Sequence, residues 1–116
     1  MLIEFVIRDY LEDALEGVPV YMEHPGSGET SYVIIEKIGS TETNHIPGAT
    51  FAVQSYAATL AEAAKLNRRV KTAMLDAIEL DMIYAVKLNS DYNYTDLSTK
   101  QYRYQGVYVI THAQEG

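Results

Sequence analysis

The segment from residue 49 to residue 81 constrains the fold more than any other part of the chain, because it predicts a strand that leads directly into the longest helix the sequence can form. Residues 50–56 alternate between two sides, which is typical of a strand with one buried face. Thr59 and Glu62 then have the S/T-x-x-E spacing of a capping box. The helix is therefore expected to begin near Leu60.

The helix that follows has a single apolar face. Its apolar residues recur at alternating spacings of three and four, which predicts one stripe about six turns long. The stripe consists of Ala63, Leu66, Val70, Ala73, Ala77 and Leu80. Charged residues fall on the other side, and no Gly or Pro interrupts the pattern. It predicts a surface helix that lies on a sheet.

The remaining elements complete one small domain of residues 1–116. A second amphipathic pattern predicts a helix over residues 3–16, followed by Gly17. Strands are expected over residues 18–23, 32–38, 49–56, 83–89 and 102–113. Pro19 restricts the first strand to a sheet edge or to the start of a strand. We therefore expect an α+β fold of order α-β-β-β-α-β-β, with a five-stranded antiparallel or mixed sheet and both helices packed on one face.

Two polar segments between strands are the expected long loops. Residues 39–48 read GSTETNHIPG, which is longer than a tight hairpin needs, and residues 90–100 carry two tyrosines. Loops of this length in a compact domain are often functional. For residues 39–48, a flexible hairpin tip is the alternative interpretation.

Composition excludes some classes of protein. Because the chain has no cysteine, it can form neither disulfides nor thiolate zinc sites. Its N-terminal residues are acidic and lack the pattern of a secretory signal, and no apolar run reaches transmembrane length. We expect a protein that acts away from membranes and is made in a cytoplasm.

The charges are unevenly distributed. The net charge is −7, and the first 45 residues carry mostly acids, whereas four bases cluster on the long helix. An acidic surface repels the phosphate backbone, so we expect no sequence-specific binding of nucleic acid. The basic cluster consists of Lys65, Arg68, Arg69 and Lys71. Two interpretations stay open: a solvated helix face paired with nearby acids, or a contact for an acidic surface on another copy or partner.

No set of residues predicts an active site. His24, His45 and His112 lack the spacing of metal ligands. Residues 91–102 begin like a calcium loop but lack its glycine and its final glutamate. A dyad of Ser27 with His24 or His45 stays open, but Ser27 lacks the strand-turn-helix context of a nucleophile. We expect no enzyme activity, no metal and no cofactor.

Three segments resemble one known family. The strand F-A-V-Q-S-Y, the capped helix T-x-x-E-A-x-x-L-N-x-x-V and the last strand R-Y-x-x-x-Y-x-I, here residues 103–110, are similar to the tail-completion or tail-terminator proteins of long-tailed bacteriophages. The order of elements agrees over nearly the whole chain. The resemblance implies a structural protein of the virion rather than an enzyme.

The resemblance also implies partners and a location. Such proteins form a ring, by resemblance a hexamer, that caps the tail tube, ends its polymerisation and provides the surface for head-tail joining. The expected partners are other copies, the major tail tube protein and the head-tail connector protein, at the head-proximal end of the tail of a virion assembled in the host cytoplasm. The expected interface residues are Lys65, Arg68, Arg69, Lys71, Asn44 and His45. The alternative is a small ligand-binding or enzymatic α+β domain that uses residues 39–48 and 90–100.

Overall fold

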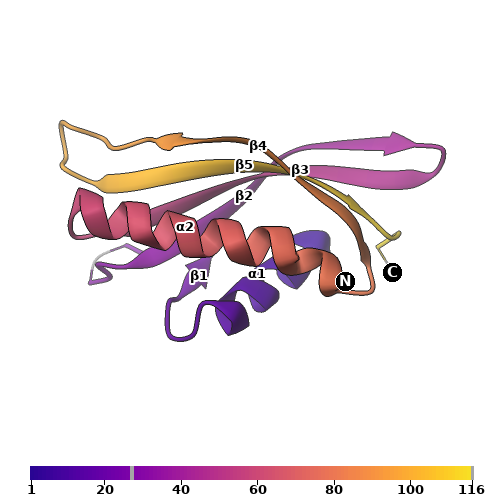
Figure 1. The fold of residues 1–116 in the computed structure, drawn as a ribbon, viewed down its shortest axis with the longest axis horizontal. Helices are drawn as coiled ribbons and strands as arrows, with labels where there is room; N and C mark the ends of the chain where they lie inside the picture. Colours follow the sequence, from indigo (N-terminus) through magenta and orange to yellow (C-terminus); the bar gives the residue numbers. More distant parts are fainter. Residues whose placement is uncertain (27, 116) are drawn as a thin grey trace.

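The computed structural model describes residues 1–26 and 28–115, and it contains a five-stranded mixed sheet with two helices below one of its faces (Figure 1). The elements in chain order are α1 (Ile3–Ala14), β1 (Val20–Tyr21), β2 (Tyr32–Thr43), β3 (Ile46–Ala57), α2 (Leu60–Asp76), the 3-10 turn η1 (Ala77–Glu79), β4 (Ile83–Asn93) and β5 (Tyr102–His112). The α+β fold and the order α-β-β-β-α-β-β predicted from the sequence are confirmed.

The sheet has the order β1-β2-β3-β5-β4. β1 runs parallel to β2, and all other neighbours are antiparallel, so the sheet is mixed. β1 pairs with β2 through Val20 and Tyr21 and lies at the edge of the sheet. Pro19, which cannot donate a backbone hydrogen bond, directly precedes β1, as expected. The predicted first strand over residues 18–23 is therefore shortened to two residues.

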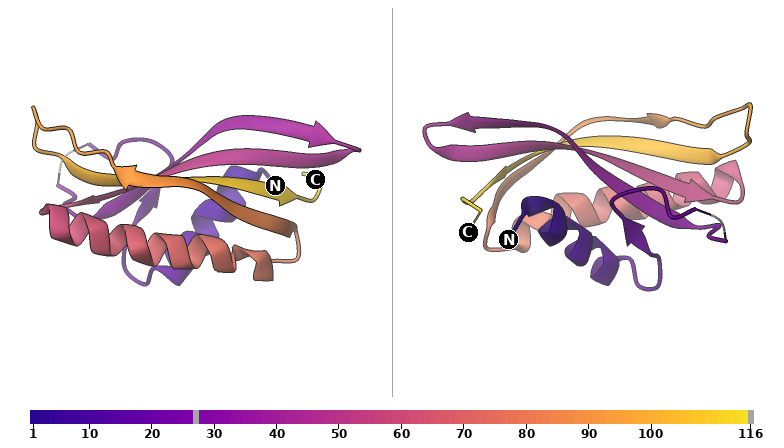
Figure 2. Two further views of the ribbon diagram at one scale, coloured as in Figure 1. Left: turned by 45° about the horizontal axis from the view of Figure 1, so that its top comes forward. Right: turned by 180° about the vertical axis from the view of Figure 1, so that it is seen from behind.

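The core lies between the helices and the facing side of the sheet. It is formed by Ile3, Ile7 and Leu11 of α1, by Leu66, Val70 and Met74 of α2, and by Val33, Ile35, Phe51, Val53, Tyr108 and Ile110 of the strands. The predicted stripe on α2 is buried, except that Leu80 is half-buried beyond the end of the helix. Figure 2 shows both helices on the same side of the sheet from two further directions.

Both helix ends follow from local chemistry. The Thr59 side chain accepts a hydrogen bond from the Glu62 N–H at 3.2 Å, so the predicted start of α2 at Leu60 is confirmed. α1 ends at Ala14, two residues earlier than predicted. Glu16 and Gly17 then both adopt positive φ, 35° and 88°, a backbone that leaves the helical conformation.

The prediction of a loop over residues 39–48 is wrong. β2 continues to Thr43 and β3 begins at Ile46, so that only Asn44 and His45 connect the strands. Both have positive φ, 52° and 65°, which is the backbone of a tight type I′ hairpin. The Gly, Ser and Thr residues of this segment are typical of turns, but their backbone groups pair in the ladder between β2 and β3. We call the outer part of this hairpin, residues 39–50, the arm.

The arm extends beyond the ends of the helices (Figure 1). A β-bulge between Lys37 and Gly39 marks its base. The predicted loop over residues 90–100 is also shorter than expected, because β4 continues to Asn93 and a bridge joins Asp96 to Gln101.

Candidate functional site

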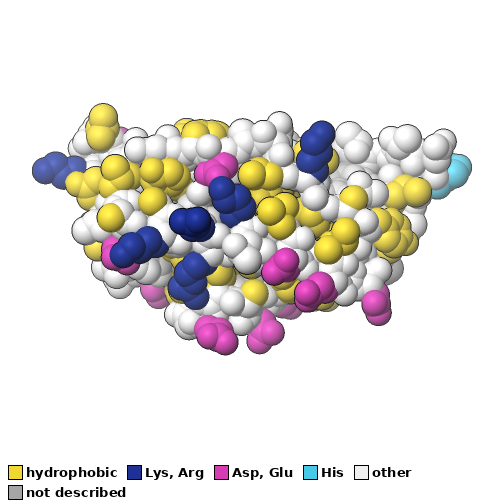
Figure 3. Space-filling model, viewed as in Figure 1, with side chains coloured by type: hydrophobic (Ala, Val, Ile, Leu, Met, Phe, Trp, Pro, Cys, Tyr) yellow, Lys and Arg dark blue, Asp and Glu magenta, His cyan; other side chains and the backbone are white. Residues whose placement is uncertain are grey.

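The basic cluster on α2 is the first candidate surface. In Figure 3 most of the basic side chains on this face gather over one half of the molecule, whereas acidic side chains lie in both halves, mainly along the lower edge. Within α2 and η1, the four bases precede Asp76 and Glu79. The bases lie in the middle turns of α2, whereas the helix macrodipole acts within the first and last turns, where the charged residues are Glu62 and Asp76. The macrodipole therefore does not explain where the bases of α2 lie.

Lys71 belongs to a partly buried polar cluster inside the domain. Its Nζ lies 2.8 Å from Asp91 Oδ2 on β4, and Asn67 Nδ2 donates to Asp91 Oδ1 at 2.7 Å. Burial acts to raise the pKa of Asp91, but the hydrogen bonds from Lys71 and Asn67 outweigh it and hold the pKa below its usual value. Lys71 thus ties α2 to β4.

Tyr108 lies next to this cluster in the core. Its side chain is fully buried on β5. Burial, followed by the charge of Asp91, raises the pKa of its phenol well above the ordinary value. The phenol therefore stays neutral and acts as part of the core.

Arg69 also has a partner within the domain. Its Nη2 donates to the carbonyl oxygen of Leu15 at 2.7 Å, just past the end of α1. This hydrogen bond satisfies a carbonyl at a helix C-terminus and joins the two helices. Like Lys71, Arg69 therefore has a structural role.

Lys65 and Arg68 form the accessible part of the basic cluster. Lys65 lies 3.7 Å from Glu62 one turn earlier, and both side chains are well exposed, so the pair contributes little. The Arg68 side chain is exposed and has no ion-pair partner among residues 1–26 and 28–115. Of the four bases, Arg68 is the one most open to an external acid.

Asn44 and His45 lie apart from the basic cluster. They form the tip of the arm, toward the opposite end of the long axis from the first turns of α2 (Figure 1). Gln114 donates to the His45 carbonyl at 2.5 Å, which links the tip to the C-terminal segment. The expected interface residues therefore form two separate surfaces.

The helix-free face of the sheet carries an aromatic cluster that sequence reasoning missed. Tyr32 and Tyr56 stack with ring centroids 4.6 Å apart, and the His24 ring packs edge-on against each at 5.7 Å. His24 Nε2 and the Tyr32 hydroxyl lie 3.2 Å apart. The alternation of β2 and β3 places both tyrosines on this face, but the contribution of the turn residue His24 has no signal in the sequence.

A polar network continues from this cluster across the sheet. Arg103 Nη1 donates to the Tyr56 hydroxyl at 2.8 Å, and that hydroxyl donates to Gln54 at 3.1 Å. Gln54 donates to Gln105 at 2.8 Å, and Gln105 donates to Tyr92. These side chains hold one another in place, so the helix-free face is a preorganised polar and aromatic surface.

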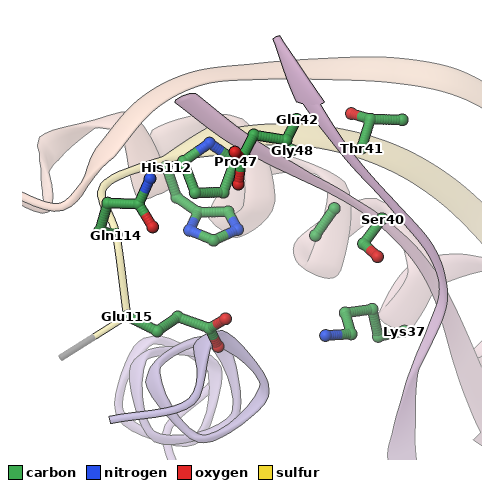
Figure 4. Close-up of a pocket in the computed structure, with 10 residues that line it drawn as sticks. Lys37, Ser40, Thr41, Glu42, Pro47, Gly48, His112, Gln114 and Glu115 are labelled. Carbon is green, nitrogen blue, oxygen red and sulfur yellow. The ribbon is translucent and has the colours of Figure 1, made fainter. Parts of the chain in front are cut away.

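A hollow of about 390 Å³ lies between the base of the arm and the C-terminal segment (Figure 4). It is lined by Lys37, Ser40, Thr41, Glu42, Pro47, Gly48, Ala49, His112, Gln114 and Glu115. Two of its charged groups, those of Lys37 and Glu115, already have partners. Lys37 Nζ lies 3.5 Å from Glu4, and the Glu115 carboxylate accepts the Ile3 N–H at 2.7 Å. The sequence did not predict this hollow, because the residues that line it are distant along the chain.

The described residues contain neither a metal-binding group nor a membrane-spanning helix. No group of three or more His, Asp or Glu side chains in residues 1–26 and 28–115 is placed to hold a metal ion. Ser27, the possible nucleophile, lies outside the described residues. No helix in the described part of the chain is long and apolar enough to cross a membrane.

Comparison with known proteins does not add a relative. The sequence matches no known protein family, and it matches no curated protein at a significant level.

Proposed function

We propose that the protein is a structural component of a phage virion that closes the head-proximal end of the tail tube as a homo-oligomeric ring. The ring, a hexamer by resemblance, ends tube polymerisation and provides the surface for head-tail joining. Its partners are other copies of the chain, the major tail tube protein and the head-tail connector protein. Its role is architectural rather than catalytic.

The observation that carries this proposal is that the three segments resembling tail-terminator proteins form one contiguous unit. The F-A-V-Q-S-Y segment lies in β3, and the R-Y-x-x-x-Y-x-I segment lies in β5, its direct neighbour in the sheet. The capped helix α2 packs on both strands. The three segments, spread over 60 residues of the chain, thus form two paired strands and the helix that packs on them.

The surface charges suit a head-to-tail assembly. The four bases on α2 are followed along the chain by Asp76 and Glu79, so basic and acidic groups lie one after the other on this element. A ring requires two different patches on each copy, one facing each neighbour. Complementary charges at such a contact set orientation more than affinity.

Electron microscopy tests the proposal directly. Purified protein is imaged by negative stain over a range of concentrations, alone and with tail tubes of long-tailed phages. Rings, or caps at one end of the tubes, are the expected result. Protein that stays monomeric and leaves both tube ends bare would overturn the proposal.

Charge reversal tests the part played by the basic cluster. Arg68→Glu is the cleaner variant, because Arg69→Glu also removes the hydrogen bond to Leu15. We expect Arg68→Glu to reduce ring or cap formation severalfold while the fold is retained. Lys100→Glu changes the net charge equally at an exposed site outside α2 and serves as the control. If the two variants assemble equally well, Arg68 is only a solvated side chain.

Val70→Asp, by contrast, places a charge in the core and is expected to unfold the domain.

The hollow beside the arm supports a second candidate, a small ligand-binding or enzymatic domain. It adjoins residues 39–48, where that alternative expects a site. Native mass spectrometry of the purified protein tests it, because a retained small molecule that is lost on Lys37→Met would favour binding over assembly. A bare chain mass supports the architectural role.

A further inference from the structure

We propose that copies of this chain join by extending the sheet: the open edge of β4 in one copy pairs with the open edge of β2 in the next. This inference rests on the proposed ring and identifies its contact. It is carried by the two unpaired edges, by the directions of the strands and by one pair of complementary charges.

Both edges offer long runs of unpaired backbone. β4 spans 11 residues and, within the described part of the chain, has a hydrogen-bonded neighbour strand only on its β5 side. β2 spans 12 residues, but β1 covers only Val33 and Ile34. Among the described residues, the backbone from Glu36 to Thr43 therefore has no strand partner on that side. A long exposed edge presents free N–H and C=O groups to any strand that can pair with it.

The directions of the strands fit a ring of identical copies. β1 is parallel to β2, and each further step to β3, β5 and β4 is antiparallel, so β2 and β4 run in opposite directions. A rotation about an axis that runs roughly along the strands carries β2 of the next copy beside β4 without reversing it. The new pair is then antiparallel, as are all the sheet's long pairs. A second copy of the chain can therefore provide the strand that pairs with the open β4 edge.

The two edges also carry complementary charges on one face. Glu36 on β2 aligns with Ala52, and Lys87 on β4 aligns with Val109, and these positions all lie on the helix-free face. Both charged side chains are exposed, and neither has an ion-pair partner among the described residues. Charges at edge strands discourage pairing with unselected strands. Opposite charges on neighbouring strands instead favour the matching edge.

Site-directed cross-linking tests the contact, since the chain has no native cysteine. In the variant Glu36→Cys with Lys87→Cys, a short bifunctional thiol reagent is expected to produce a ladder of covalent oligomers up to the full ring. Either single variant has one thiol and cannot produce a ladder. Glu36→Cys with Thr72→Cys places the second thiol on the exposed side of α2 and controls for collision. An equal ladder from this control would overturn the proposal.

A charge swap tests the same contact without a reagent. Glu36→Lys and Lys87→Glu are each expected to lower the fraction of protein in rings severalfold, and the double variant is expected to restore it. Both positions are exposed, and circular dichroism verifies that the fold is retained. Losses that simply add in the double variant would refute pairing of these two side chains.

The outcomes separate this inference from the proposed function. If rings form but the Glu36–Lys87 variants neither cross-link nor compensate, edge pairing is wrong and the ring stands. If Lys87→Cys alone gives efficient covalent dimers, two β4 edges meet around a two-fold axis, and head-to-tail pairing is wrong. If the wild-type protein forms no ring at any concentration or on tubes, both proposals fall.

Discussion

Replacement of Asp91 by asparagine tests whether Lys71 serves the fold or an interface. The asparagine is nearly isosteric and keeps an oxygen for the Asn67 amide, but it removes the negative charge that Lys71 Nζ contacts at 2.8 Å. If the contact stabilises the domain, the variant loses stability as an isolated chain. Lys71 is then unavailable to an external partner.

The expected loss follows from the exposure of the two groups. A hydrogen bond to a charged group contributes roughly 1.5–3 kcal/mol. The side chains of Asp91 and Lys71 are 21% and 35% exposed, so solvent screens part of this interaction. We therefore expect Asp91→Asn to lower the free energy of unfolding by about 1–2 kcal/mol. With a urea slope of about 2 kcal/mol per M, the midpoint falls by roughly 0.5–1 M.

The effect has a defined pH dependence. The folded-state pKa of Asp91 lies below its ordinary value, so its contribution is fully present above the unfolded-state pKa of about 3.9. As the pH falls below that value and through the folded-state pKa, the carboxylate is protonated and the contribution is lost. The difference between wild type and variant is therefore constant near neutral pH and shrinks in acid.

Urea unfolding followed by circular dichroism, at neutral pH and at about pH 2.5, below the unfolded-state pKa, measures both effects. Asp81→Asn makes the same change of charge at an exposed site and is the control. The reasoning is refuted if the two variants have equal midpoints at neutral pH, or if the deficit of Asp91→Asn is undiminished in acid. A double-mutant cycle of Lys71→Met and Asp91→Asn then measures the coupling free energy between these two side chains.

Three further substitutions test other parts of the fold by the same unfolding measurement. Gly106→Ala places a Cβ 2.8 Å from the ring of Tyr108, which is fully buried. We expect this variant to lower the free energy of unfolding by about 1–3 kcal/mol. An unchanged urea midpoint would contradict this packing. Ser55→Ala removes a buried hydroxyl that has no hydrogen-bond partner among the described residues. The free energy of unfolding is therefore expected to be unchanged or to rise by up to about 1 kcal/mol, and a clear loss would reveal a partner. His45→Gly relieves a positive φ of 65° at the hairpin tip and is expected to stabilise the domain by about 0.5–1 kcal/mol, whereas destabilisation would argue against the tight turn.

Local patterns predicted the central elements correctly because their own chemistry determines them. Thr59 and Glu62 fixed the start of α2, and the period of the apolar stripe fixed its buried face. The arm was missed for the opposite reason. Its residues Gly39, Pro47 and Gly48 are of types that are depleted in strands, and the ladder between Gly39 and Thr50 depends on a partner strand rather than on local preference.

The candidate site was only partly predictable. The basic cluster is visible in the sequence, but its division into structural and accessible bases depends on Asp91 and Leu15, which are distant along the chain. Likewise, the packing of His24 on Tyr32 comes from the path of a turn. Residues that meet through tertiary structure leave no periodic signal.

The net charge of −7 makes the proposed assembly depend on salt in a particular direction. Repulsion between copies acts over long distances and is screened strongly at 0.1 M salt, where the Debye length is about 10 Å. Backbone pairing at the β2 and β4 edges involves no net charge and is affected less. Moderate salt is therefore expected to favour rings even though it weakens the contact between Glu36 and Lys87. An assembly that depended mainly on the basic cluster of α2 would instead weaken steadily as salt is added, so a salt titration distinguishes pairing of sheet edges from attraction between charged surfaces.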